Sequence, residues 1–164
     1  MIVPASETAL SAHHVAAVAV LVIRDGRVLA LRRSQHKDAA PGVWETLSGR
    51  LEPGEEPYPA AVREALEETG LAVDVERRPW TAYAADRAGE PMLVVVYRGT
   101  PVAGELTLSD EHDDHAWLDA DAFAVRSPLS KLVEAVRSAL EAPAPTRTAA
   151  PAPASGTGTA TGDA

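Results

Sequence analysis

Glutamates are gathered in one central segment whose residue types suit divalent-cation chemistry. The segment runs from Gly49 to Leu71 and reads GRLEPGEEPYPAAVREALEETGL. Glu55 follows the first glycine after five intervening residues, and the run REALEETGL begins after seven more. Hard divalent cations prefer oxygen ligands, and Mg²⁺ is usually held by carboxylates together with substrate phosphates. The segment therefore indicates a cation site beside a phosphate group.

A helix is the natural way to place the second half of this segment. The range Ala60 to Thr69 contains good helix formers and neither Gly nor Pro. Pro59 suits the first helical position, and Gly70 suits the left-handed residue that ends a helix. We therefore expect a helix that starts near Pro59 and stops at Gly70.

Three acids share one side of this expected helix. At roughly 100° per residue, an arc of about 100° contains Glu64, Glu67 and Glu68. The opposite side carries the apolar residues that we expect to pack, Val62, Ala65 and Leu66. Carboxylates this close repel one another unless a cation lies among them. A solvated acidic face is the ordinary alternative. However, a match to a fixed pattern at seven positions, such as the one described next, arises by chance on the order of once per 10⁸ starting points, at roughly 7% per residue.

At these spacings the segment resembles the Nudix box, the signature of hydrolases that cleave nucleoside diphosphates linked to another group. The resemblance covers roughly residues 16–140 and implies an α/β fold, the Nudix α/β/α sandwich with a mixed, curved β-sheet and the box loop and helix. It also implies a Mg²⁺ cofactor, which Mn²⁺ can replace, and a small phosphorylated nucleotide as substrate. One departure is Leu47-Ser48-Gly49, where family members commonly have Pro-Gly-Gly or Pro-Ala-Gly.

The resemblance assigns metal-binding roles within the segment. Glu67 and Glu68 are the expected principal ligands, and Glu64 is either a further ligand or the base that activates water. Glu55 is expected to anchor the loop or to contribute to metal binding. A backbone carbonyl near Gly49 is expected to ligate metal, although plain turn chemistry would also explain a glycine there.

Other charged residues have expected roles in positioning and substrate binding. Arg63 cannot ligate a cation, and its fixed fork suits holding a glutamate in one rotamer. Glu111 is a second candidate for the catalytic base or an additional ligand, with a solvated loop acid as the alternative. Arg32 and Arg33 face the substrate phosphates or simply end a strand in solvent, and Arg50 is a further substrate-binding candidate.

The remaining sequence predicts a mixed sheet between helices. We expect strands at 15–24, 27–33, 91–98 and 116–118, irregular strands within 71–85, and a hairpin turn at Asp25-Gly26. We expect residues 100–108 to be irregular and residues 109–114 to form an acidic loop. Residues 121–125 should form a short turn that Asp119 or Asp121 caps, and residues 130–140 should form an amphipathic helix. The domain would span 13–141, after a flexible arm at 1–12 and before a disordered Ala/Pro/Thr/Gly-rich tail at 142–164.

Bulk composition excludes several other classes. The chain has 164 residues, one domain's worth, and a net charge of −9, which argues against a binder of duplex nucleic acid. It has no cysteine, which excludes disulfides and thiol catalysis and is compatible with the cytoplasm. The longest apolar run, Val15 to Ile23, is too short to span a bilayer. A homodimer is an option only by analogy with related hydrolases.

The substrate can be approached only by elimination. The ADP-ribose branch tends to have a proline where this chain has Asp86-Arg87-Ala88. The dinucleoside-polyphosphate branch tends to have a tyrosine further from the box than Tyr83. The coenzyme A branch has an upstream motif that Leu29 to Gly49 does not reproduce. The nucleoside-triphosphate group remains, including 8-oxo-dGTP diphosphatases, with release of the monophosphate and pyrophosphate. The alternatives are an ADP-ribose or sugar-nucleotide pyrophosphatase and a catalytically silent nucleotide-binding regulator. The absence of cysteine disfavours a prenyl-diphosphate isomerase. Aromatic residues that could stack on a base, or lie in the core, are Trp44, Trp80, Tyr83 and Tyr97.

Overall fold

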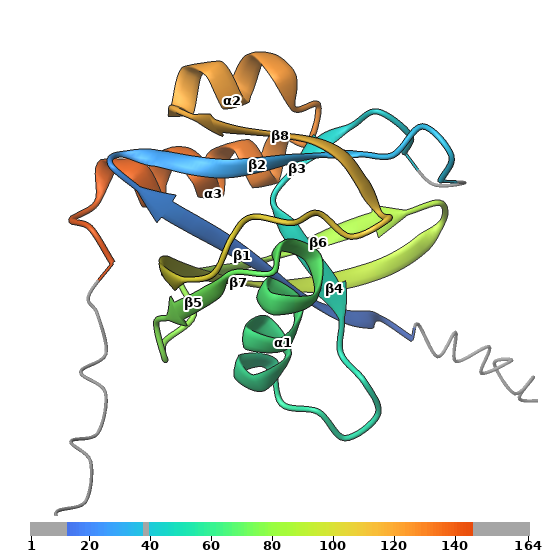
Figure 1. Cartoon of the computed structure of the whole chain (residues 1–164). Helices are drawn as coiled ribbons and strands as arrows, with labels where there is room; N and C mark the ends of the chain where they lie inside the picture. Colours follow the sequence, from blue (N-terminus) through green and yellow to red (C-terminus); the bar gives the residue numbers. More distant parts are fainter. Residues whose placement is uncertain (1–12, 38–39, 146–164) are drawn as a thin grey trace, which may run out of the picture.

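The computed structural model of the chain describes residues 13–37 and 40–145. Its elements are listed here in chain order (Figure 1): β1 (Val15–Arg24), β2 (Arg27–Arg33), β3 (Trp44–Glu45), β4 (Leu47–Arg50), α1 (Pro57–Thr69), β5 (Ala72–Val75), β6 (Thr81–Arg87), β7 (Glu90–Ala103), β8 (His112–Leu118), α2 (Ala120–Arg126) and α3 (Ser130–Glu141). The predicted mixed α/β class is confirmed.

The sheet is organised around β1. On one edge β1 runs parallel to β7 along most of its length. On the other edge it pairs antiparallel with β4 through its first half and with β2 at its end. The strands β5 and β6 both pair with β7, and β3 and β8 both pair with β2. One parallel pairing among antiparallel ones makes the sheet mixed, as the sequence predicted.

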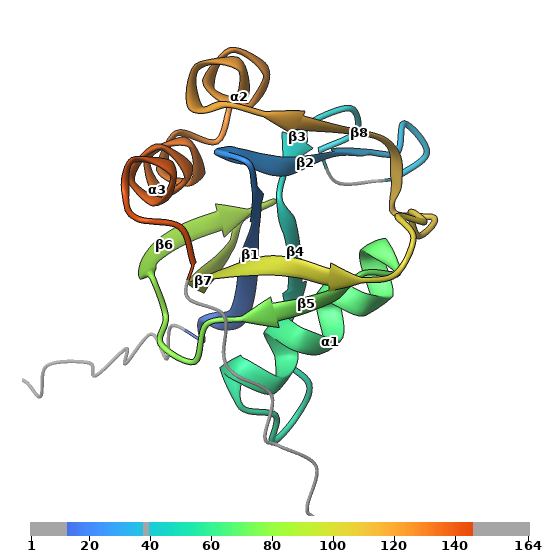
Figure 2. The same ribbon diagram turned by 60° about the vertical axis from the view of Figure 1, so that its left-hand side comes forward.

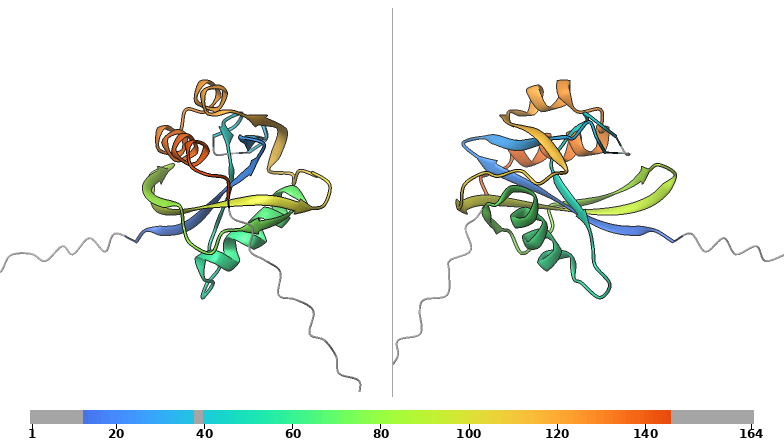
Figure 3. Two further views of the ribbon diagram at one scale, coloured as in Figure 1. Left: turned by 90° about the vertical axis from the view of Figure 1, so that its left-hand side faces the viewer. Right: turned by 45° about the vertical axis from the view of Figure 1, so that its right-hand side comes forward.

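Helices cover both faces of the sheet, as Figures 2 and 3 show from several sides. Successive side chains of a strand point to opposite faces. One face, under α2 and α3, therefore receives Ala17, Ala19 and Leu21. The other face, under α1, receives Val18, Val20 and Val22. Because both faces are buried, β1 reads as a continuous apolar run rather than an alternating one.

Several boundaries differ from the sequence-based expectations. The helix α1 begins at Pro57 rather than near Pro59, because Pro57 already supplies the fixed φ of a first helical residue. Strand β7 continues to Ala103, where residues 100–108 were expected to be irregular, because β5 pairs with this part. Strand β8 begins at His112 inside the expected acidic loop, because it pairs with β2. Partner strands outweigh local composition in each case.

The hairpin turn and the short helix agree with the sequence. Asp25 and Gly26 both have positive φ, 51° and 70°, as a two-residue hairpin turn between β1 and β2 requires. Asp119 caps α2, because its side chain accepts a hydrogen bond from the backbone N–H of Ala122. Both features were predicted from short-range sequence signals.

The ends of the chain are only partly described. The predicted flexible arm at 1–12, and 146–164 of the predicted disordered tail, lie outside the described residues. Residues 142–145 are described, and the Pro143 carbonyl accepts a hydrogen bond of 2.9 Å from Arg98. The boundary between the domain and the tail at 142 stays a prediction. Within the described ranges, no helix is long and apolar enough to cross a bilayer.

Candidate active site

The site is built where α1 packs against β4. Three small residues of the helix, Ala60, Ala61 and Ala65, are buried and let the helix come close to the strand. Gly49 of β4 is the contact point, because a Cβ built on it would lie 1.9 Å from the carboxylate of Glu64. The Glu64 carboxylate therefore occupies space that only a glycine leaves open.

The buried face of α1 differs from the one expected from the helical wheel. Glu64 and Glu68 are 9% and 5% exposed, whereas the expected packing residues Val62 and Leu66 are 39% and 57% exposed. Of the expected packing residues only Ala65 is buried. The glycine on β4 explains the difference, because it opens room for carboxylates on the side where the small residues pack. The acids thus point into the molecule.

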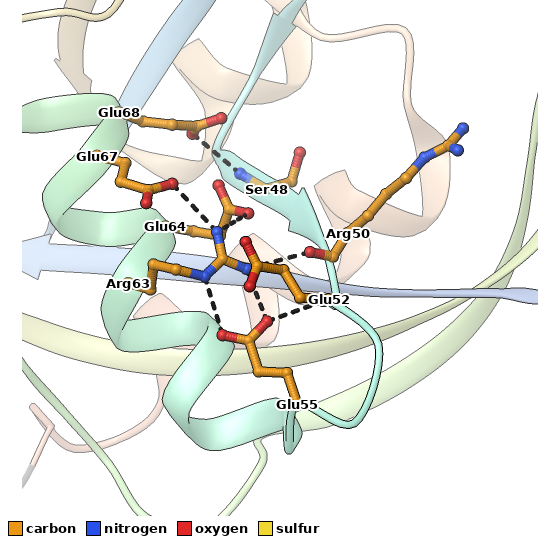
Figure 4. A network of polar contacts seen from close by, with 8 residues as sticks. All are labelled: Ser48, Arg50, Glu52, Glu55, Arg63, Glu64, Glu67 and Glu68. Atoms are coloured by element: carbon orange, nitrogen blue, oxygen red, sulfur yellow. Dashed lines mark hydrogen bonds and ion pairs between the residues drawn. The ribbon is translucent and has the colours of Figure 1, made fainter.

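Arg63 holds three glutamates around its guanidinium (Figure 4). Its Nε and Nη2 donate to Glu55 at 2.9 and 2.8 Å, and its Nη1 donates to Glu64 at 2.8 Å and to Glu67 at 3.1 Å. Nη2 also donates to the Arg50 carbonyl at 3.2 Å, which ties the helix to the end of β4. The hydrogen bonds from Arg63, together with the backbone N–H of Glu52, lower the pKa of Glu55 to about 2. Arg63 has the geometry expected of a residue that fixes glutamate rotamers.

Glu68 lies apart from this arginine. Its Oε2 accepts a hydrogen bond of 3.2 Å from the backbone N–H of Ser48 (Figure 4). Burial, followed by the negative charges of Glu45 and Glu64, raises its pKa to about 9. Within the described ranges no arginine or lysine forms an ion pair with Glu68. This buried acid therefore lacks the compensating cation that a buried charge needs.

A cavity of about 420 Å³ opens on the other face of β4. Side chains alternate along the strand, so Leu47 and Gly49 face α1 while Ser48 and Arg50 face the cavity. The cavity is lined by Ala17, Ala19, Arg33, Ala40, Val43, Glu45, Thr46, Ser48, Gly49, Arg50, Tyr83, Ala85, Asp86, Arg87, Ala88, Met92, Val94, Leu129 and Leu132. Five of its lining residues are alanines, and Arg33, Glu45 and Arg50 supply its charged groups near the box.

The three arginines predicted to meet substrate lie in different places. Arg33 lines the cavity, with its Nη1 3.0 Å from Glu45. Arg50 lines the rim and pairs with Glu90 at the start of β7. Arg32 does not line the cavity and forms an ion pair of 2.7 Å with Asp113, so the structure does not bring it to the site. Neighbouring residues of a strand point to opposite faces, and only one of this pair can face inward.

Glu111 lies beside the site. Its Oε2 is 3.7 Å from Nη1 of Arg33, and its side chain is 45% exposed. Its negative charge contributes to raising the pKa of both Glu64 and Glu68, after burial as the main cause. Its role as base or ligand remains a prediction.

Of the four aromatic residues considered for stacking on a base, only Tyr83 lines the cavity. Tyr97 is buried at 3% exposure in the core beneath α1. The ring of Trp80 packs against the guanidinium of Arg98, whose Cζ lies 4.3 Å from the ring centroid. Trp44 lies beneath the Arg126 guanidinium at 4.9 Å. The structure places these three outside the cavity wall.

The sequence reasoning missed Glu45 and His112. Glu45 precedes the box and lines the cavity, and its charge is the largest charge effect on Glu68. His112 contacts Glu45, with Nε2 at 3.2 Å from Oε1. A charged residue inside the short strand before the box, Trp44-Glu45, was an available signal for Glu45. No local pattern in the sequence indicates His112.

Comparison with known proteins decides the family. The sequence matches the family model of the NUDIX domain over residues 12–140. The chain belongs to the Nudix family. This Nudix protein is 32% identical to a MutT-like protein of Streptomyces ambofaciens over 123 residues, which are 75% of each chain. It is also 38% identical over 123 residues to an octanoyltransferase of Myxococcus xanthus, covering 70% of this chain but only 32% of that protein, about a third of its length.

A solved structure agrees with the fold. The MutT protein from Methanosarcina mazei Go1 superposes with a TM-score of 0.70 at 22% identity, covering 80% of this chain and 96% of that one. The predicted Nudix fold is thereby confirmed, and the family assignment makes the chain a pyrophosphohydrolase. Nudix hydrolases in general use divalent metal ions.

The donor chemistry of this Nudix site fits such an ion. Carboxylate and backbone oxygens are the ligands that hard cations prefer, and buried Glu68 needs a positive partner. Across residues 13–37 and 40–145, however, no set of three or more His, Asp or Glu side chains is gathered closely enough to enclose a metal. Glu55, Glu64 and Glu67 instead form ion pairs with the guanidinium of Arg63.

Gly49→Ala should remove turnover while leaving the fold largely intact. The added Cβ displaces the end of the flexible Glu64 side chain, so we expect turnover to fall at least about 100-fold. The free energy of unfolding should fall by no more than about 1 kcal/mol. Release of nucleoside monophosphate from a nucleotide panel and urea denaturation measure the two effects. In a Glu64→Ala background the stability cost should vanish; Gly49→Ala with wild-type turnover would contradict this account.

Glu68→Gln should stabilise the metal-free protein near neutral pH. Below pH 4.5, the usual pKa, the acid is protonated in the folded and the unfolded chain, so it has no effect. Between pH 4.5 and about 9 the unfolded chain alone releases this proton, and the wild type loses stability as pH rises. A neutral glutamine avoids this loss, so its free energy of unfolding should be higher by about 3 kcal/mol near pH 7. Urea denaturation in EDTA at acidic and neutral pH measures the difference, and a less stable variant at neutral pH would refute the burial argument.

Proposed function

We propose that this Nudix hydrolase cleaves a phosphoanhydride bond of nucleoside triphosphates, oxidised deoxynucleotides included. The products are the nucleoside monophosphate and pyrophosphate, and the cation is Mg²⁺, for which Mn²⁺ can substitute. The observation that carries the proposal is the cavity on the far side of β4 from Glu64, which continues to the glycine of the box.

The cavity suits a nucleoside in size and in lining. Small-molecule sites commonly have volumes of roughly 300–1,000 Å³ and mostly apolar walls with a few polar groups, and this cavity of about 420 Å³ falls in that range. Alanines at 17, 19 and 85 leave a shallow floor, and Tyr83 supplies an aromatic wall. A flat base can stack there while the phosphates reach the charged end near Gly49.

The names of related proteins support a triphosphate. One relative is the MutT-like protein of Streptomyces ambofaciens, and another is the nucleoside triphosphatase NudI of Salmonella arizonae, which is 29% identical over 118 residues, 66% of this chain and 84% of that protein. Both names belong to those proteins, and both are compatible with the cavity of this one.

In the proposed reaction the side chains of α1 bind and orient. Glu64, Glu67 and Glu68 would hold the cation, which would supply positive charge to the phosphate oxygens and to the attacking water. Arg63 keeps Glu55 and Glu64 in place through its fork. Glu64 or Glu111 accepts the proton of the water, and Arg33 and Arg50 bind phosphate oxygens.

A substrate panel with Mg²⁺ tests the proposal directly. The wild type should show its highest kcat/KM with a nucleoside triphosphate or 8-oxo-dGTP, and should release pyrophosphate. Glu68→Gln should lower that kcat/KM at least about 100-fold, because a buried ligand is lost. Highest kcat/KM on ADP-ribose, a dinucleoside polyphosphate or a sugar nucleotide would reject the substrate class. Equal turnover by wild type and variant would reject the site.

Ala17→Leu should weaken use of the nucleoside without touching the acids of the box. Ala17 is 3% exposed and lines the floor of the cavity, so a larger side chain fills the space proposed for the base. We expect KM for the best triphosphate to rise about tenfold. Ala16→Leu is the matched control, because its side chain points to the other face and is exposed. Equal KM values for Ala17→Leu and wild type would place the nucleoside elsewhere.

A further inference from the structure

Three residues from three strands meet inside the protein beside the cavity. His112 comes from β8, Glu45 from β3 and Arg33 from β2. The Nε2 of His112 lies 3.2 Å from Oε1 of Glu45, and Nη1 of Arg33 lies 3.0 Å from the same oxygen. One carboxylate oxygen thus joins an imidazole to a guanidinium.

The contact is buried on the histidine side and open on the cavity side. The side chains of His112, Arg33 and Glu45 are 1%, 7% and 12% exposed. Arg33 and Glu45 line the cavity, whereas His112 does not. Buried ion pairs are weak contributors to stability, because desolvation offsets the attraction. The position of Arg33 and Glu45 at the cavity wall therefore explains the arrangement better than a contribution to stability does.

The histidine is polarised toward Glu45. A carboxylate only accepts hydrogen bonds, so Nε2 of His112 must carry the proton and donate. Nδ1 is buried and has no hydrogen-bond partner within the described residues. An unsatisfied buried polar atom costs roughly 1–3 kcal/mol. Within the described residues, the imidazole of His112 therefore makes its one hydrogen bond to Glu45.

The backbone brings His112 opposite Arg33. The pairing of β2 with β8 shifts register between Arg32 and Arg33, where β8 carries Asp113 as an extra residue. Such bulges re-aim side chains next to active sites, and this one lies on the strand of His112. Arg32 stays outside with Asp113, while Arg33 lies opposite His112 across the strands. The backbone N–H of Arg33 also donates to the Val43 carbonyl at 2.9 Å, which fixes it against the loop before β3.

We propose that His112 is a positioning residue for substrate binding. It holds the Glu45 carboxylate, and Glu45 in turn holds the Arg33 guanidinium at the cavity wall, where the guanidinium binds an anionic oxygen of the phosphate chain. The inference rests on the proposed function for the identity of the substrate. It adds a residue that never touches the substrate and yet sets its affinity.

Substitutions at His112 can separate positioning from packing. The side-chain amide of Gln reaches the place of Nε2, whereas that of Asn reaches the place of Nδ1. His112→Gln should keep KM for the best triphosphate within about threefold of wild type. His112→Asn and His112→Leu should raise KM about tenfold and change kcat less than about threefold, because Arg33 binds substrate in both ground and transition states.

Two further measurements make the result decisive. His115→Leu is the matched control on the same strand, since His115 is exposed and lies outside the cavity. In an Arg33→Ala background His112→Leu should have no further effect on KM, because its influence passes through that arginine. Additive effects in the double variant, or equal KM for the Gln and Asn variants, would overturn the proposal. Should the Leu variant fail to fold, the Gln and Asn pair still decides.

Binding separates this inference from the proposed function. The dissociation constant of a methylene-bridged, non-hydrolysable nucleoside triphosphate should rise about tenfold in His112→Asn and stay within about threefold in His112→Gln. If wild type binds this analogue with that pattern but hydrolyses no triphosphate, the proposed reaction is wrong and the positioning role stands. If triphosphates are hydrolysed and the pattern is absent, the positioning role is wrong.

Discussion

The close approach of α1 to β4 is the contact on which the rest of the site depends. Gly49 has no side chain, and the carboxylate of Glu64 lies where one would be. Buried alanines on the helix allow the same approach along its length. Close packing leaves few alternatives in a protein interior, so this one contact fixes how far Glu64 and Glu68 reach toward the strand and where Arg63 can gather the remaining acids.

Strand β4 also separates the two halves of the site. It pairs with β1 along one edge, and its other edge offers the Ser48 N–H to Glu68 and the Arg50 carbonyl to Arg63. Unpaired edge groups usually invite another strand, but here side chains of α1 form hydrogen bonds with them. One face of the strand meets the acids and the other lines the cavity, so a substrate crossing this strand would reach both at once.

Local signals in the sequence predicted several elements but not β3 and β4, and long-range contacts bring the site together. The hairpin at Asp25-Gly26 and the helix ending at Gly70 follow from residues next to one another in sequence, and both were predicted. The burial of Glu64 was not, because a helical wheel ranks faces by hydrophobicity and has no access to a glycine fifteen residues upstream on another element. Glu45 and His112 are 67 residues apart and meet only because β3 and β8 both pair with β2. Spacing within a motif could not reveal that contact.

Local charge balance explains how a protein with a negative net charge can belong to a family that acts on negatively charged nucleotides. Two arginines neutralise most of the local acids, with Arg63 holding Glu55, Glu64 and Glu67 and Arg33 holding Glu45 near Glu111. Burial keeps Glu68 protonated near neutral pH. Once its proton is released, Glu68 would repel a phosphate chain unless a cation is bound. A divalent cation reverses the sign of the local field. The net charge of −9 is therefore no obstacle to such a substrate, because a bound cation and the nearby arginines would set the local field rather than the whole surface.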